Sequence, residues 1–172
     1  MSHGIARTNK VTKALTLDDD NSATDVDACF TVAGTVKLHA LYLEVTGGTT
    51  LTNATAVYFD LYSANGSTVL TKADGALSGK DAGFMMYKND VLTVTGAYID
   101  PSAAPVVTEE ATADLSLEHE CFVTEDRTAG AHVATTIRLH HTSSDTSPAH
   151  NQTVIVHCEW EAKSADGALV AV

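Results

Sequence analysis

The chain has 172 residues, 44% of them hydrophobic and 19% charged, which is enough for one globular domain with its own core. Its formal net charge is −12, and so acidic a body repels phosphate backbones, which argues against nucleic acid as the main partner. No apolar run reaches the ~18 residues of a membrane span, and the N-terminus lacks the apolar stretch of a secretory signal. We therefore expect no membrane partner and synthesis in the cytoplasm.

The first 17 residues combine basic charge with a strand pattern. Arg7, Lys10 and Lys13 precede the first acidic residue, and residues 11–17 have the pattern of a first edge strand. The segment 1–17 is therefore either a flexible arm that docks on an acidic protein surface, or an edge strand with a frayed, solvated end.

The remaining domain, residues 18–172, is a succession of short strand patterns separated by Gly, Pro, Asn and Asp. In residues 35–46, apolar side chains alternate with polar ones, and toward the C-terminal end the apolar residues move to the other face. This pattern predicts a strand partly covered on both faces. Asn65-Gly66 between two strand patterns predicts a hairpin. The expected strands comprise residues 11–17, 29–32, 35–46, 56–63, 68–71, 91–99, 115–124, 131–141 and 152–162.

Eight or nine strands at this spacing, without an apolar stripe of helical period, predict an all-β fold. We expect a single-domain antiparallel β-sandwich, jelly-roll-like or Ig-like. Aromatic residues make up only 6% of the chain, so the core must consist mainly of Val, Leu and Ala. Residues 125–130 are expected to form a turn, and 164–172 a small-residue tail. The anchors expected in the core or at a subunit contact are Phe30, Leu41, Tyr42, Phe59 and Trp160.

The spacing of reactive side chains gives no catalytic or metal-binding signature. Cys29, Cys121 and Cys158 are odd in number and widely spaced, which predicts buried free thiols instead of disulfides. Eight histidines occur without HExxH, HxH or CxxC spacing, so we expect no metal site and no cofactor. The chain also lacks a GxSxG motif, and we expect that it is not an enzyme.

Several segments resemble small virion structural proteins of tailed bacteriophages. Residues 29–38, CFTVAGTVKL, are similar to the F-x-V-x-G-x-V-x-I/L opening of such proteins, and residues 41–52 continue the pattern. The strand VYFDLY at 57–62 follows, and a last strand ending at Trp160 leads into a Gly-Ala-Val tail at 166–171. An acidic loop after the first strand and several histidines depart from the pattern.

The resemblance implies a β-sandwich that coats or joins parts of a virion, and within that class a capsid decoration (cement) protein without catalysis. It implies a homotrimer bound to the major capsid protein on the outer capsid surface, with Arg7, Lys10 and Lys13 as the capsid-binding arm. Weak contacts repeated over a lattice add by avidity. Two alternatives stay open: another virion component, such as a head-fibre base, neck or tail-tube protein, and a carbohydrate-binding β-sandwich module.

Overall fold

The computed structural model describes residues 8–18, 25–51, 54–71, 77–87, 121–142 and 151–172. Every regular element in these ranges is a β-strand, and no helix of the described residues is long and apolar enough to cross a membrane. All strand pairs in these ranges are antiparallel, and ten of the twelve strands form two layers, so the expected all-β antiparallel sandwich is confirmed. Arg7 and the strand expected at 91–99 lie outside the described residues.

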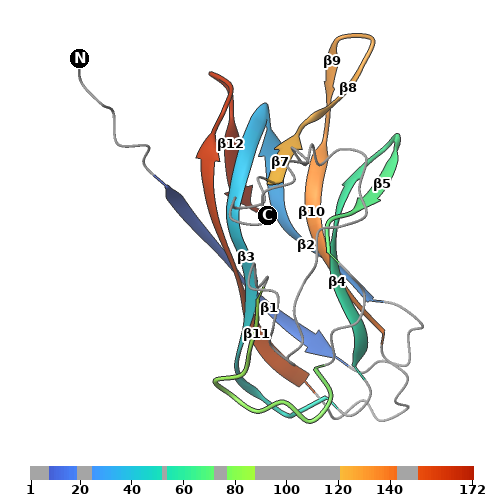
Figure 1. Cartoon of the computed structure of the whole chain (residues 1–172). Helices are drawn as coiled ribbons and strands as arrows, with labels where there is room; N and C mark the ends of the chain where they lie inside the picture. Colours follow the sequence, from blue (N-terminus) through green and yellow to red (C-terminus); the bar gives the residue numbers. More distant parts are fainter. Residues whose placement is uncertain (1–7, 19–24, 52–53, 72–76, 88–120, 143–150) are drawn as a thin grey trace, which may run out of the picture.

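One layer, sheet A, is built around two long strands that pair with each other (Figure 1). The last long strand lies between the first strand and the third, and the far edge of the third strand carries two short strands. The strands of sheet A are β1 (Asn9–Asp18), β3 (Thr35–Gly48), β6 (Met85–Tyr87), β7 (Cys121–Thr124) and β11 (Asn151–Ala162).

The other layer, sheet B, has the strand order β12-β2-β10-β4-β5. Ser63 pairs with Gly66 across a tight turn, which confirms the hairpin expected at Asn65-Gly66. The strands of sheet B are β2 (Asp25–Ala33), β4 (Thr55–Ser63), β5 (Gly66–Val69), β10 (Thr135–Thr142) and β12 (Ala168–Ala171). A separate hairpin is formed by β8 (Asp126–Thr128) and β9 (Ala131–Val133).

The core lies between the two sheets and takes inward-facing residues mainly from their longer strands. Of the expected anchors, Phe30, Leu41 and Phe59 are buried in this core. Trp160 is partly buried and packs against it. Tyr42 is only partly buried and lies among the outward residues of β3, stacked on a side chain of the neighbouring strand.

The change of apolar phase in β3 is caused by a β-bulge, and the expectation of a strand covered on both faces is wrong. In the pairing with β11, Glu159 lies opposite Ala40 and Trp160 opposite Leu38, which leaves His39 as an extra residue. One extra residue reverses which side chains face inward. Leu38 before the bulge and Leu41 after it are therefore both buried in the same core.

The described residues contain twelve strands, more than the eight or nine expected. Short strands account for the difference, because they carry too few residues for an alternating pattern. Part of the expected tail, 164–172, is strand β12, which pairs with β2. The turn expected at 125–130 contains β8, and the strand expected at 131–141 is two strands, β9 and β10.

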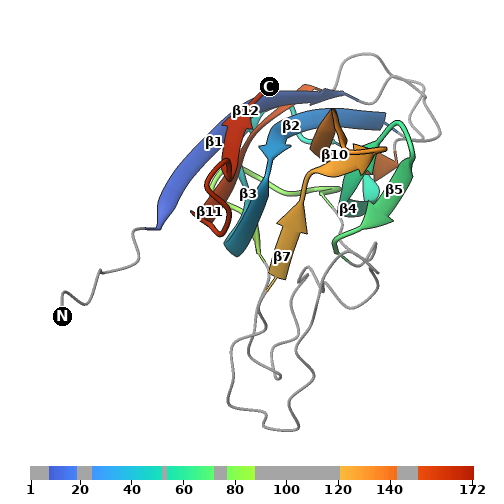
Figure 2. The same ribbon diagram turned by 90° about the horizontal axis from the view of Figure 1, so that it is seen from above.

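The segment Asn9–Asp18 is an edge strand and not a flexible arm, because all ten of its residues pair with β11. The strand β12 is the corresponding edge of sheet B, and the two edge strands lie side by side (Figure 2). Lys13 Nζ donates a hydrogen bond to the carbonyl oxygen of Val172, which joins the two sheets along this side.

Candidate functional site

The two described residues of the expected capsid-binding arm, Lys10 and Lys13, do not form one basic patch. They are three positions apart on a strand, so their side chains lie on opposite faces of β1. Lys10 Nζ is 3.1 Å from Glu159 Oε1, and the hydrogen bond to this carboxylate raises the pKa of Lys10. Lys13 is engaged with Val172.

All three cysteines are free and buried, as the sequence predicts. Burial raises the pKa of Cys29 to about 12 and also raises the pKa of Cys158. A thiol acts as a nucleophile or metal ligand in its deprotonated form, and burial in apolar surroundings suppresses that form. These thiols therefore serve as small core side chains.

The outer face of sheet A is occupied by paired charged groups. His157 stacks on Tyr42 with ring centroids 4.5 Å apart, and its Nε2 lies 3.1 Å from Glu44 Oε2. Glu161 lies between two cations, with His39 Nε2 at 3.4 Å and Lys163 Nζ at 2.9 Å. Exposed pairs of this kind contribute little to stability, but they leave the face well solvated.

The outer face of sheet B carries a buried carboxylate between two aromatic side chains. Asp60 is 2% exposed and accepts hydrogen bonds from Arg138 Nε (2.9 Å) and Nη2 (2.5 Å). Arg138 lies over the Tyr62 ring at 3.8 Å, and His140 stacks on Tyr58 at 4.4 Å. Burial alone would raise the pKa of Asp60, but the contacts with His140 and Arg138 outweigh it and hold that pKa below its usual value.

Exposed apolar side chains concentrate on this same face. Val69 lies opposite Asp60 and Val26 opposite His140, so both share the outer side of sheet B with the aromatic pairs. On β12, Leu169 is buried and Val170 is 60% exposed, which directs Val170 outward. Of the six large exposed apolar side chains among the described residues, all but Met85 belong to this sheet and its C-terminal extension: Val26, Tyr62, Val69, Val170 and Val172.

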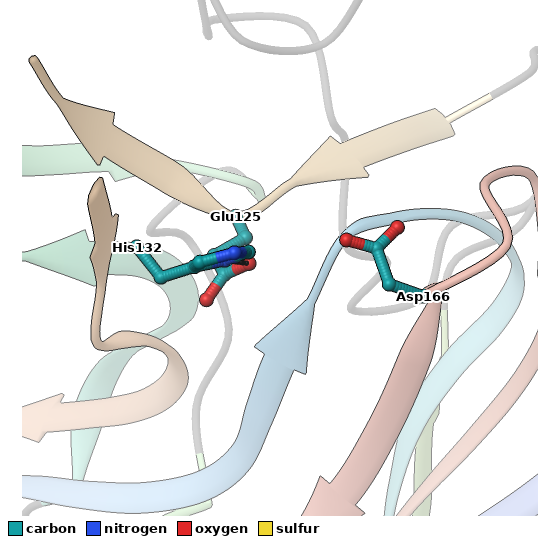
Figure 3. A group of neighbouring side chains, drawn as sticks. All are labelled: Glu125, His132 and Asp166. Atoms are coloured by element: carbon teal, nitrogen blue, oxygen red, sulfur yellow. Dashed lines mark hydrogen bonds and ion pairs between the residues drawn. The ribbon is translucent and has the colours of Figure 1, made fainter. Parts of the chain in front are cut away.

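A second group of polar side chains that could act together gathers where β7, β8, β9 and the β11–β12 loop meet (Figure 3). Glu125 lies between β7 and β8, His132 is in β9, and Asp166 is in the loop before β12. One donor atom from each of the three lies within 4.8 Å of the others, and His132 Nδ1 is 2.6 Å from Glu125 Oε2. The hydrogen bond with His132 lowers the pKa of Glu125, and a hydrogen bond from Ser164 lowers that of Asp166.

The sequence does not reveal this group, because its members come from three separate segments. His132 and Glu125 are seven residues apart and Asp166 is more than thirty residues further along, which matches no ligand spacing. Only the pairing of β8 with β9 and the course of the β11–β12 connection bring them together.

A shallow groove of about 350 Å³ lies beside this end, between the β4–β5 hairpin and the β7–β8 connection. Most of the residues that line it have polar side chains. Asp126 is already engaged there, because Oδ2 accepts hydrogen bonds from Ser63 Oγ (2.5 Å) and Asn65 Nδ2 (2.8 Å). The residues that line the groove include Tyr62, Ser63, Asn65, Ser67, Thr68 and Asp126.

The chain was compared with protein-family models, with curated proteins and with solved structures. No family model matches it, and neither a curated protein nor a solved structure is significantly similar to it.

Proposed function

We propose that this protein is a structural component of a virion, a capsid decoration protein that attaches to the capsid lattice through the outer face of sheet B. The observation that carries the proposal is the asymmetry of the two outer faces. Sheet A presents paired charges to solvent, whereas sheet B presents four exposed apolar side chains on four of its strands, Val26, Tyr62, Val69 and Val170. Apolar area exposed on one face and interspersed with polar groups is typical of a contact surface.

The arrangement of polar groups on sheet B suits a protein surface as its partner. Arg138 and Tyr62 are residue types enriched at protein interfaces, and the Arg138 guanidinium is already fixed by Asp60. A pre-fixed side chain loses little conformational entropy on docking. Repetition of this contact over a capsid, in groups of three copies, would add many modest affinities by avidity.

The test is binding of the full chain to capsids of the encoding virus prepared without this protein. Val170→Glu combined with Val26→Glu places two carboxylates on the outer face of sheet B, and we expect at least tenfold weaker co-sedimentation of this double variant with capsids. Equal melting temperatures of the double variant and the wild type exclude a folding defect.

The oligomeric state is a separate test. Light scattering of the wild-type protein should give three times the chain mass of 18.0 kDa if the trimer forms in solution.

Met85→Glu is the matched control, because Met85 is an exposed apolar side chain of sheet A. It adds the same type of charge to the opposite layer, and we expect capsid binding to remain unchanged. Loss of binding in the control to the same extent, or full binding of the double variant, would contradict docking through sheet B.

The groove beside the β4–β5 hairpin favours one alternative, carbohydrate binding. Tyr62 offers an aromatic ring for stacking on a sugar, and Asn65, Ser67 and Thr68 offer groups that can form hydrogen bonds with its hydroxyls. Screening the protein against a glycan array separates the two functions. Specific glycan binding that is lost in Tyr62→Ala and retained in Met85→Glu would replace the decoration proposal.

A further inference from the structure

Three connections between strands meet at the end of the sandwich that holds Glu125 and Asp166. They are the β2–β3, β7–β8 and β11–β12 connections. Gly34 leads from β2 in sheet B to β3 in sheet A, and the loop containing Asp166 leads from β11 in sheet A to β12 in sheet B. Glu125 N donates to Gly34 O (2.7 Å), and Gly34 N donates to Glu125 Oε2 (3.2 Å). Thr35 N donates to Ser164 Oγ (2.7 Å), and this hydrogen bond holds the β11–β12 loop against the β2–β3 connection.

Gly34 has a steric role in this assembly. Its φ of +55° lies in the left-handed region, and a Cβ atom there would come within 2.5 Å of Asp166 Oδ1. Because Gly34 has no side chain, the Asp166 carboxylate can lie against the backbone of Gly34. In this position it is close to the side chains of Glu125 and His132 (Figure 3).

We propose that Glu125, His132 and Asp166 form a binding site for a divalent transition-metal ion of the Zn²⁺ type. One imidazole nitrogen and two carboxylate oxygens, within 4.8 Å of one another, are a ligand set of the kind that such ions accept. Ca²⁺ and Mg²⁺ prefer oxygen ligands throughout, so they should bind more weakly. The inference is independent of the proposed docking function, since none of the three residues belongs to the outer face of sheet B.

The structure supports this proposal in two further ways. Glu125 is held by Gly34 N and its side chain is only 11% exposed, whereas those of His132 and Asp166 are about half exposed and can be reached by an ion from solvent. The cluster also already attracts a cation of the protein itself, because Arg127 Nη2 lies 3.3 Å from Asp166 Oδ2. A metal ion would displace this guanidinium from the carboxylate.

Titration calorimetry of the metal-stripped full chain with ZnCl₂, CoCl₂ and CaCl₂ tests the site. We expect one Zn²⁺ per chain, with affinity reduced by at least about tenfold in His132→Gln and in Asp166→Asn, because each removes a ligand. Bound Co²⁺ should give visible absorption bands that disappear in both variants. Arg127→Gln should bind Zn²⁺ more tightly than wild type, since the competing cation is removed.

His39→Gln is the matched control, because His39 also pairs with a surface carboxylate, and among the described residues no third metal-ligating side chain lies close enough to complete a group with that pair. It should bind Zn²⁺ as wild type does. Undiminished binding by His132→Gln, loss of binding in His39→Gln, or no binding by the wild-type chain would overturn the proposal. Circular dichroism of each metal-free variant shows whether folding is retained, and the rise expected for Arg127→Gln cannot arise from a folding defect.

Discussion

The outer faces of the two sheets contain the same local unit in different surroundings. In each, a tyrosine stacks on a histidine of the neighbouring strand, and the carboxylate two residues after the tyrosine lies 3.1 Å from Nε2 of that histidine. The two units are Tyr42, Glu44 and His157 on sheet A, and Tyr58, Asp60 and His140 on sheet B.

The difference lies in what surrounds each carboxylate. Glu44 is 38% exposed, whereas Asp60 is buried and bonded to Arg138, with Val69 opposite it on the neighbouring strand. The same pattern of residues therefore gives a solvated ion pair on one layer and a buried ion pair on the other. Burial depends on the neighbouring strands, and it decides how much each unit contributes to stability.

The largest expected effect is that of Asp60→Asn. Removal of this carboxylate leaves the Arg138 guanidinium without its partner on a mostly buried site, which we expect to cost about 3 kcal/mol in the free energy of unfolding. Glu44→Gln removes the corresponding carboxylate of sheet A and should cost less than about 1 kcal/mol. Urea unfolding of both variants measures the two losses in free energy of unfolding. Equal losses would show that the carboxylate of sheet B is no more important for stability than that of sheet A.

A smaller effect is expected in the acid dependence of stability. The pKa of Asp60 is lower in the folded protein than in the unfolded chain, where it is about 3.9. Its contribution is thus fully present at neutral pH and is lost as the pH falls below about 4 through the folded-state pKa. The stability difference between wild type and Asp60→Asn should therefore shrink between pH 5 and pH 2. A difference that stays constant over this range would refute the role of Asp60 ionisation.

The smallest expected effect is that of Lys10→Ala on sheet A. Lys10 is exposed and its ion pair with Glu159 is open to solvent, so the melting temperature should not change measurably. A clear drop in the melting temperature would indicate that the paired charges of sheet A stabilise the fold more than exposed ion pairs usually do. Differential scanning calorimetry at low and at high salt provides the measurement.

The alternation along β11 could be read directly, since its buried residues Val154, Val156 and Cys158 occupy every second position. The hairpin at Asn65-Gly66 was equally local. Neither candidate site could be predicted in this way. The exposed apolar side chains of sheet B include Val170, whose position depends on β12 pairing with β2, and the group of Glu125, His132 and Asp166 depends on three connections meeting at one end. Both arise from strand order, which a local pattern does not contain.

The bulge at His39 also governs which changes in chain length this fold can accept. Deletion of His39 alone would remove the bulge and place Leu38 and Leu41 two positions apart, so both would still face the core on a regular strand. Deletion of one regularly paired residue of β3 would instead turn every residue on one side of it to the opposite face. Length changes within β3 therefore follow a parity rule with one exception: changes of two residues preserve the inward set, and a change of one residue preserves it only where it removes a bulge.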